Sequence, residues 1–563
     1  MHSMILLINP PIVRPFHPIP ATAVLAAYLK SKGIDAHQLD ANLSFWKWIS
    51  LPRQVNELYD DAAGYHSLLS RSGDATFSDR LKLHASQQVM QYENCNAAMK
   101  ALSENGEDLL HQLGLLMAYK YEGKRGVFSS RDMEVNPRMA LFEDFMLSRD
   151  YACSGLNDLI EIIEKEESIF PMVYRDCSLL DEIYSFDPEI IGLSIFGPLN
   201  VVPAFALARE LRRDGYDGKI LIGGAWISLF GDVLEDRRIF DYIDGIVRGE
   251  GEIPLFAYGQ TLSGDKSLHD VPGLVFMNNG TVVRNAPVVP VPLADLPTPD
   301  FDNLFLRKYW ERGTLTIPSS RGCAWGKCTF CNLKRNATCG FMVRPVKLLA
   351  SDFIELKNRY AAEKIIFTDT GVAPTVLAHL DGAFRSLGVS RAGDNLPRWH
   401  AFARVNANFT DKIFVAARQS GCESLCWGIE SGSDGVLEKM RKGFTVQQAS
   451  RILHLAADSG IKNYVHIIMG FPGEKDEDIQ ATLDFLASHK NVFYKASVLR
   501  FKVTRESAIH HHPDRFGVKI LQDDKDNALC LDLPFIYDAG PSEEMLADAE
   551  SRIKNEELSE GFQ

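Results

Sequence analysis

The chain has 563 residues, more than one hydrophobic core normally holds, so we expect two or three domains. Hydrophobic residues (46%) and charged residues (24%) have ordinary globular shares, and a net charge of −14 without a basic stripe argues against a nucleic-acid partner. The sequence shows neither a membrane span nor a signal peptide, and its 10 cysteines form no disulfide pattern, so we expect a cytoplasmic protein without a membrane partner.

The first part of the chain predicts a β-α-β unit whose pattern resumes much later. A continuous apolar run starts at residue 4 and is broken by Asn9 and Pro10, and a helical pattern follows. Similar strands and helices return after residue 180. We therefore expect a doubly wound, Rossmann-like α/β domain formed by residues 1–50 and 180–290, with ligands at the carboxyl ends of its strands. The predicted strands are 4–8, 35–40, 190–196, 219–224 and 242–248, and the predicted helices are 21–30 and 203–213.

Residues 51–179 separate the two parts of this domain. They carry no strong strand signal and have a helical composition, and the segment is too long for a loop. We expect a helical insertion. It either only packs against the domain, or it caps a cofactor and shapes the substrate cavity.

Residues 305–500 alternate strand and helix patterns six times. In a parallel α/β arrangement of this kind, active residues gather at the carboxyl ends of the strands. Residues 501–563 predict a small C-terminal region that closes the site and carries substrate specificity. That region contains three adjacent histidines, at 510–512, which cannot all face one ion, so no metal site is expected there. The predicted strands are 314–319, 364–369, 399–404, 424–430, 464–469 and 493–500.

Three cysteines follow the first of these strands with the spacing C-x4-C-x2-C: Cys323, Cys328 and Cys331. Three thiolates so close together, without a fourth at matching spacing, suit a cubane iron–sulfur cluster that leaves one iron open to a ligand. Two alternatives need further cysteines. A structural zinc site could add Cys422 and Cys426, although they lie in a predicted buried strand, and a plant-type [2Fe–2S] centre would need one more, for which Cys339 stands eight residues beyond Cys331.

The cysteine loop and the segments after it resemble the radical S-adenosylmethionine (SAM) superfamily over residues 310–500. The matching segments are 320–331, 341–344, 365–369, 403–405, 427–433 and 468–474. The usual family spacing is C-x3-C-x2-C, so the extra residue here changes the shape of the loop. The resemblance implies a partial (β/α)6 barrel of TIM type, a [4Fe–4S] cluster and SAM as a cofactor.

The resemblance also implies roles for residues at the ends of the barrel strands. Glu430 would bind the SAM ammonium or ribose, and Arg404 would pair with the carboxylate, unless these two residues form a structural ion pair. Backbone from Gly470 to Glu474 would contact the adenine. The SAM-binding residues expected in this way are Phe330, Asp369, Arg404, Glu430, Ser431, Ser433 and Gly470.

Glycines follow two strands of the N-terminal domain and would let backbone approach a large ligand, although turn glycines are common. Placed before a radical SAM core, this domain resembles the cobalamin-binding domain of B12-dependent radical SAM proteins. The Asp-x-His-x-x-Gly signature is absent, so His17 is not expected to bind cobalt, and Phe196, Pro198 and Leu199 are candidates for the lower face. The expected cobalamin-binding residues are Asn9, Pro10, Ser194, Phe196, Pro198, Leu199, Gly223, Gly224, Trp226, Ser228, Gly249, Glu250 and Gly251.

The resemblance implies a radical SAM C-methyltransferase. A 5′-deoxyadenosyl radical would activate an unactivated carbon, and methylcobalamin would methylate it. The alternatives are a cyclase, rearrangement enzyme or epimerase with the same cofactors, an α/β domain that binds no cobalamin, and a non-catalytic iron–sulfur electron carrier. The expected partners are a small-molecule or peptide substrate, such as a natural-product intermediate, and a reductant such as flavodoxin or ferredoxin. No catalytic side chain is identified from the sequence.

Overall fold

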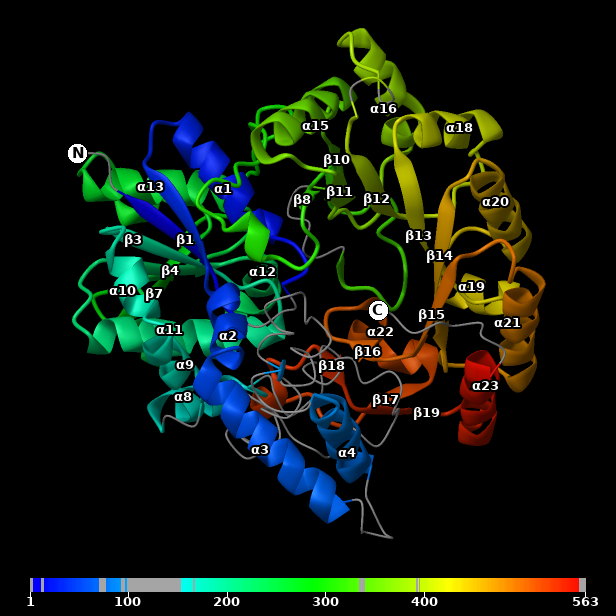
Figure 1. Ribbon diagram of the computed structural model, residues 1–563, viewed down its shortest axis with the longest axis horizontal. Helices are drawn as coiled ribbons and strands as arrows, with labels where there is room; N and C mark the ends of the chain where they lie inside the picture. The colour runs from blue at the N-terminus through cyan, green and yellow to red at the C-terminus, as the bar shows by residue number, and fades with distance from the viewer. Residues whose placement is uncertain are drawn as a thin grey trace. The chain divides into compact units, whose positions relative to one another are not determined.

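The computed structural model forms two compact units, and each is described by itself (Figure 1). The described residues are 4–11, 15–69, 77–92, 97–98, 153–165, 168–333, 340–390, 393 and 395–555. The first unit, called the N-terminal unit, comprises Met1–Val288, Asp302–Arg312 and Asp524–Cys530. The second, called the barrel unit, comprises Val289–Phe301, Gly313–Asp523 and Leu531–Gln563. Among the described residues, no helix combines the length and apolar character that crossing a bilayer requires.

The N-terminal unit contains a seven-stranded sheet in the order β2-β1-β3-β4-β5-β6-β7. The first five strands in this order are parallel, as the sequence predicted, and their order is that of a doubly wound fold. The sequence analysis missed the last two strands, an antiparallel hairpin added at the β5 edge. The strands are β1 (Ile5–Asn9), β2 (Ala36–Asp40), β3 (Ile190–Ser194), β4 (Lys219–Gly223), β5 (Gly245–Val247), β6 (Leu274–Asn278) and β7 (Thr281–Arg284).

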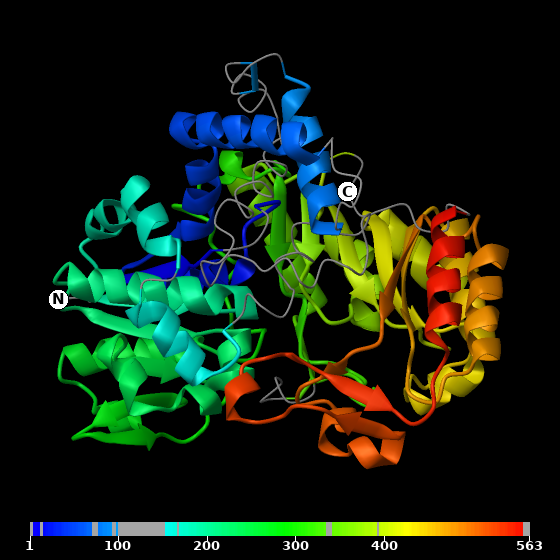
Figure 2. The same ribbon diagram turned by 90° about the horizontal axis from the view of Figure 1, so that it is seen from below.

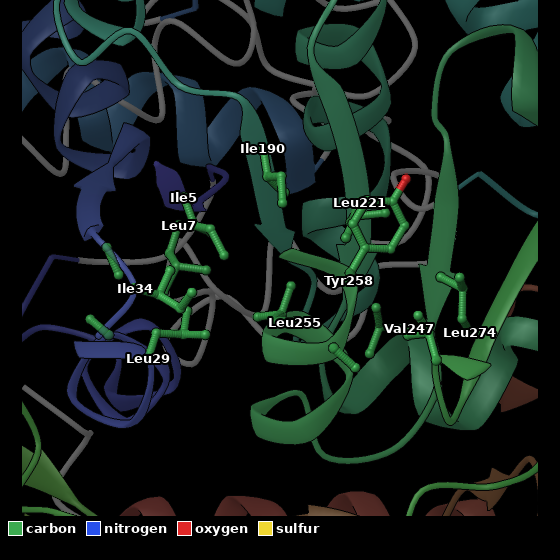
Figure 3. Close-up of a cluster of buried hydrophobic side chains, with 14 of the residues drawn as sticks. Ile5, Leu7, Leu29, Ile34, Ile190, Leu221, Val247, Leu255, Tyr258 and Leu274 are labelled. Atoms are coloured by element: carbon green, nitrogen blue, oxygen red, sulfur yellow. The ribbon is translucent and has the colours of Figure 1, made fainter. Parts of the chain in front are cut away.

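Helices cover both faces of this sheet (Figure 1). On one face, Leu29 of α1 and Leu255 of α13 pack into a buried cluster with Ile5, Leu221 and Val247 of the strands (Figure 3). Fully burying an aliphatic side chain contributes about 1.5–3 kcal/mol, so this cluster is a main source of the unit's stability. The helices are α1 (Pro20–Ser31), α2 (Ala41–Ile49), α11 (Val201–Arg213), α12 (Ala225–Phe230) and α13 (Glu252–Leu262).

Every regular element in the described parts of segment 51–179 is a helix. Within its described parts there is no strand, and much of the remainder lies outside the described residues. The proposed domain boundaries of the insertion stay a prediction. The helices are α3 (Pro52–Leu69), α4 (Phe77–Met90), α8 (Leu156–Glu164) and α9 (Phe170–Asp176), and α10 (Leu179–Tyr184) ends just after the segment.

The barrel unit is built on six parallel strands in the order β15-β14-β13-β12-β11-β8. Helices lie on the outside of the sheet, and its end strands, β8 and β15, do not pair with each other, so the barrel is open as predicted (Figure 1). The strands are β8 (Thr314–Ile317), β11 (Lys364–Phe367), β12 (Arg398–Ala403), β13 (Cys422–Glu430), β14 (Lys462–Met469) and β15 (Lys495–Arg500). The helices are α15 (Val346–Tyr360), α16 (Pro374–Ser386), α18 (Asp411–Gln419), α19 (Asp434–Lys439), α20 (Val446–Asp458) and α21 (Asp476–Ser488).

Side chains alternate between the two faces of these strands. Trp399 and Trp427 are fully buried on the face that packs against the helices, where Trp427 meets Phe414 of α18. The intervening positions, such as Phe402 and Cys426, are less buried and lie on the opposite face, which we call the inner face of the barrel.

The C-terminal part of the barrel unit forms two short antiparallel strand pairs and a final helix. The helix α23 lies alongside α21 (Figure 2), and Arg552 donates a hydrogen bond of 2.9 Å to Gln480. Arg500, at the end of β15, also pairs with Glu543 and Glu550 of α23. The elements are β16 (Val503–Thr504), α22 (Ala508–His511), β17 (Val518–Ile520), β18 (Asp532–Leu533), β19 (Phe535–Tyr537) and α23 (Glu543–Asn555).

Candidate functional site

The cysteine loop leaves the carboxyl end of β8 and is held at its entry by Asp369. One carboxylate oxygen of Asp369 accepts hydrogen bonds from the backbone N–H of Ser319 (2.8 Å) and Ser320 (2.9 Å), and the other accepts from the Ser319 hydroxyl. Burial raises the pKa of Asp369 to about 6. Asp369 was predicted to bind SAM, but both of its oxygens already bond to the start of the loop.

The three cysteines of the loop are all half-buried. Backbone N–H groups point at two of the sulfurs, from Gly326 to Cys323 Sγ (3.3 Å) and from Leu333 to Cys331 Sγ (3.5 Å). Burial raises the pKa of Cys331 to about 11, so the Leu333 N–H and a bound metal would have to stabilise its thiolate. The residues therefore suit metal ligation.

The spacing of the sulfurs fits a cluster better than a single ion. Among the described residues, the three thiols do not form a group whose ligand atoms all lie within 4.8 Å of one another, as one ion would demand. Cys422 is fully buried on β13, and Cys426 bonds to His466, so neither supplies a second zinc knuckle. Cys339 lies outside the described residues.

Hydrogen bonds tie the cysteine loop to later parts of the chain. Thr329 donates from its N–H to the Met440 carbonyl (3.1 Å), and its own carbonyl accepts from the N–H of Ile509 in α22 (3.1 Å). Trp325 Nε1 donates to the Arg441 carbonyl over 2.8 Å, and Asn332 donates to the Arg505 carbonyl over 3.2 Å. The loop is thus fixed from the turn after α19 and from the C-terminal region.

Glu430 ends β13 with a left-handed φ of 74° and is buried. Its Oε1 accepts a hydrogen bond of 3.0 Å from Lys442 Nζ, and Lys442 is itself only 5% exposed. Gly428 allows this arrangement, because a Cβ there would lie 2.5 Å from Glu430 Oε1. The sequence analysis missed Lys442, whose only signal is a basic residue in the turn after α19.

Arg404 follows β12 and lies between the cysteine loop and the Lys442 turn. Its guanidinium stacks on Trp325, 4.0 Å from the ring centroid, and donates to the carbonyls of Val405 (3.0 Å) and Lys442. Its Nε is buried without a hydrogen-bond partner among the described residues. Glu430 pairs with Lys442, so the alternative of an Arg404–Glu430 ion pair is not what the structure contains.

The positive charges of Lys442 and Arg404 affect the pKa of a cysteine in the loop. Burial raises the pKa of Cys328, and the positive charges of Lys442 and Arg404 act against that rise. Phe330, another predicted SAM contact, is half-buried, and its ring centroid lies 5.9 Å from Lys442 Nζ. The cysteine loop, Glu430, Lys442 and Arg404 therefore form one site.

The two serines predicted to bind SAM, Ser431 and Ser433, make hydrogen bonds within the protein. Ser431 Oγ accepts the N–H of Ser433 (3.1 Å) and lies 3.2 Å from the Thr482 hydroxyl. Ser433 caps α19 and donates to Asp478 over 2.5 Å. Their hydroxyls hold the β13–α19 turn against α21.

Gly470 was expected to offer its backbone to adenine. The N–H groups of Gly470 and Phe471 instead donate to Glu474 Oε2, over 2.6 and 3.0 Å. Burial raises the pKa of Glu474 to about 7, and its Oε1 is buried without a partner among the described residues. The turn is closed on itself through Glu474 Oε2, so these two N–H groups are not available to a ligand.

In the N-terminal unit, Asn200 joins two loops at the carboxyl edge of the sheet. Its Nδ2 donates to the carbonyls of Pro10 (3.1 Å) and Pro11 (3.0 Å), after β1, and its Oδ1 accepts from the N–H of Gly197 (3.2 Å), after β3. The strand order reverses between β1 and β3, where doubly wound folds bind ligands. The sequence analysis missed Asn200. The predicted residues Phe196, Pro198 and Leu199 lie half-buried in the second loop.

The glycines of this edge are explained mostly by the fold. Gly224 has a φ of 111°, and a Cβ there would lie 2.4 Å from the Ile195 carbonyl oxygen. Ser228 Oγ donates to the Gly224 carbonyl and accepts the N–H of Gly249, each over 3.0 Å. Gly251 faces the Leu25 side chain of α1, 3.2 Å from an added Cβ.

Other predicted residues leave polar atoms for a ligand. Asn9 Oδ1 and Trp226 Nε1 are buried and have no hydrogen-bond partner among the described residues. Both lie at the carboxyl edge, Asn9 as the last residue of β1 and Trp226 just after β4. Ser194 is buried opposite Gly223 in the sheet, and Glu250 is half-buried before α13. This edge therefore fits a large ligand with polar groups. His17, which was not expected to bind cobalt, is half-buried in the loop after β1.

The histidine run of the C-terminal region is closer to a metal geometry than expected. Ligand atoms of Glu506, His510 and His511 lie within 4.8 Å of one another. However, His510 Nδ1 accepts the Glu506 N–H (3.1 Å) and its Nε2 bonds to Asp523 (3.0 Å). Both ring nitrogens are occupied, so the group does not fit a metal without rearranging.

Comparison with known sequences shows a radical SAM domain. Residues 317–486 match the model of the Radical SAM superfamily. An uncharacterised methyltransferase of Pyrococcus horikoshii is 29% identical over 307 residues, which are 54% of this chain and 65% of that protein. Cytidylyl-2-hydroxyethylphosphonate methyltransferase of Streptomyces wedmorensis is 23% identical over 356 residues, 55% of this chain and 64% of that protein. The chain thus spans just under two thirds of these curated relatives.

Two solved structures share the fold over nearly the whole chain. The cobalamin-dependent SAM radical enzyme OxsB, with aqua-cobalamin and SAM bound, has a TM-score of 0.59 at 14% identity and covers 98% of this chain and 66% of its own. The radical SAM methyltransferase TsrM of Kitasatospora setae, with cobalamin and a [4Fe–4S] cluster, has a TM-score of 0.59 at 15% identity and covers 98% and 91%. TsrM has also been solved with tryptophan as substrate.

Proposed function

We propose that this chain, which carries a radical SAM domain on the fold of the cobalamin-dependent radical SAM enzymes, is a methyltransferase. The observation that carries the proposal is the single site at the carboxyl end of the barrel strands: a tied loop with three free thiols beside the Glu430–Lys442 pair and Arg404. The methyltransferase names of its relatives support methyl transfer.

The residues of the barrel unit would each have a defined task. Cys323, Cys328 and Cys331 would bind three irons of a [4Fe–4S] cluster and leave one iron for SAM. When bound, the cluster would supply the electron that cleaves SAM to a 5′-deoxyadenosyl radical. Glu430, which already accepts a hydrogen bond from Lys442, would also accept one from the SAM ammonium, and Nε of Arg404 would donate to the SAM carboxylate.

The N-terminal unit would hold cobalamin at its carboxyl edge as the carrier of the methyl group. Trp226 Nε1 and Asn9 Oδ1 offer a donor and an acceptor to its polar groups. The half-buried loop of Phe196, Pro198 and Leu199 offers an apolar surface to the flat ring and no histidine to the cobalt. These features support cobalamin bound without a protein ligand on the metal.

The finer form of the proposal is methylation of an unactivated carbon in a small-molecule or peptide intermediate, with flavodoxin or ferredoxin as reductant in a reducing cytoplasm. The test uses methyl-deuterated SAM with the reduced holoenzyme and candidate substrates. We expect deuterium in the product together with 5′-deoxyadenosine. Formation of 5′-deoxyadenosine with an unlabelled product would instead favour cyclisation or epimerisation, and failure to cleave SAM would leave an electron carrier.

A further inference from the structure

The inner face of the barrel carries a thiol–imidazole pair to which neither the cluster nor SAM assigns a role. Cys426 lies on β13 and His466 on the neighbouring strand β14, and Sγ lies 2.8 Å from Nε2. The residue paired with His466 across the strands is Gly428, which has no side chain, so the imidazole can reach Cys426 diagonally. The two residues therefore form a defined contact in the middle of the sheet.

An aromatic ring extends the pair across the inner face. Phe402, paired with Cys426 on β12, stacks on the imidazole with a centroid distance of 5.8 Å and an interplanar angle of 27°. Phe402 is 48% exposed, and Leu499 on β15 is 50% exposed. Large apolar side chains of this exposure on the inside of a barrel offer an apolar wall to a ligand.

The environment favours the neutral form of both partners. Burial raises the pKa of Cys426 to about 12, and burial lowers the pKa of His466 below its ordinary value. In the arrangement in which the protonated thiol donates to Nε2, the ring proton is on Nδ1. Among the described residues, none hydrogen-bonds to Nδ1, and that N–H is left for a ligand.

We propose that Cys426 and His466 orient the substrate: Nδ1–H of His466 donates a hydrogen bond to an acceptor on the substrate, and Cys426 holds the tautomer that makes this donation. The substrate class is a molecule with a neutral oxygen or ring-nitrogen acceptor beside an apolar ring that rests on Phe402. This inference depends on the proposed function, because it takes the inside of the barrel as the substrate cavity. His466 contacts substrate, and Cys426 is a positioning residue.

The test uses two probes that differ mainly in the acceptor, acetophenone and ethylbenzene, with the full-length protein labelled with ¹⁵N-histidine. We expect the His466 ring to show the Nδ1–H tautomer, and acetophenone to bind about three- to tenfold more tightly than ethylbenzene, the range of one net hydrogen bond. His466→Phe identifies the NMR signal by its loss and should bind both probes equally. His466→Asn, whose amide N–H replaces Nδ1–H, should restore most of the preference.

The variants of Cys426 separate positioning from packing. Cys426→Ser keeps a donor and should keep the Nδ1–H tautomer, whereas Cys426→Ala should give a mixture of tautomers and a weaker preference for acetophenone. An Nε2–H tautomer in the unmodified protein, or a preference that survives His466→Phe, would overturn the proposal. SAM cleavage by the unmodified reduced protein is measured in parallel. If cleavage is absent while the preference follows His466, the proposed function fails and the donor role stands.

Discussion

The carboxyl edges of the two parallel sheets offer different chemistry. The barrel edge presents charged side chains, because Glu430, Lys442 and Arg404 surround the cysteine loop. The N-terminal edge presents loop backbone held together by Asn200, the neutral amide of Asn9 and the indole N–H of Trp226. The barrel edge suits a small zwitterion, which is recognised by its charges. The N-terminal edge suits a large flat ligand, which is recognised by its shape and a few hydrogen bonds.

The largest effect should come from removing the cluster ligands. Alanine at Cys323, Cys328 or Cys331 should abolish the iron–sulfur absorbance and SAM cleavage, since in the proposed site each thiolate would bind a separate iron. Cobalamin binding should survive, because the N-terminal unit has its own core. Iron content, electron paramagnetic resonance and cobalamin titration check this.

Matched controls for the cluster are the cysteines outside the loop. Cys422→Ala and Cys339→Ala should keep the cluster. Loss of its resonance signal in Cys339→Ala would contradict the open iron. Loss of cobalamin binding in the loop variants would contradict the independence of the two edges.

The next effect concerns the buried ion pair. Lys442→Met leaves the Glu430 carboxylate buried and unpaired, which should reduce the free energy of unfolding by about 3–5 kcal/mol. The double variant Glu430→Gln/Lys442→Met should recover most of that stability and still bind SAM at least tenfold more weakly, measured by denaturation and by equilibrium dialysis with SAM. Tight SAM binding by the double variant would show that the barrel edge does not use these charges.

In the N-terminal unit, we expect ligand binding to depend on the backbone conformation of the turns and not on charged side chains. Gly224→Ala places a Cβ 2.4 Å from the Ile195 carbonyl oxygen and should destabilise the unit by about 1–3 kcal/mol and weaken cobalamin binding. Gly215 has a φ of 90°, but a Cβ added there would have no other atom within 4 Å. Gly215→Ala therefore measures the cost of the backbone conformation alone and should leave cobalamin affinity unchanged. Equal cobalamin affinity in both variants would contradict a role for the β4 turn.

The most gradual effect is a pH dependence of the barrel unit. The pKa of Glu474 is about 7 in the fold and near 4.5 when unfolded, so its contribution to stability is complete below about pH 4.5 and is lost as the pH rises through 7. Glu474→Gln cannot ionise and should be less sensitive to pH over this range, by at most about 1.4 kcal/mol per pH unit. Thermal unfolding at pH 5, 6, 7 and 8 compares the two proteins, and parallel curves would contradict the raised pKa.

The sequence predicted the strands well and the partners of the site residues poorly. Apolar periodicity located six barrel strands and five strands of the N-terminal sheet, because alternation and burial are local properties. The family motifs pointed to Glu430 and Arg404, but Lys442 reaches Glu430 across α19, and such a contact has no local pattern. For the same reason Asn200, which bonds to a loop about 190 residues earlier, could not be found. The β6–β7 hairpin was missed although both of its signals are local, the apolar run Leu274–Met277 and the Asn279-Gly280 turn between the strands.

The bond between Thr329 and Ile509 also bears on how the protein matures during its synthesis. The cysteine loop leaves the ribosome about 180 residues before the segment that fixes it through Ile509 and Arg505. Domains of a growing chain fold as they emerge, so the N-terminal unit can form much of its sheet while the cysteine loop still lacks its final support. Cluster assembly is therefore expected to follow the emergence of residues 505–509, and a protein truncated before residue 505 should remain without a stable cluster even though all three cysteines are present.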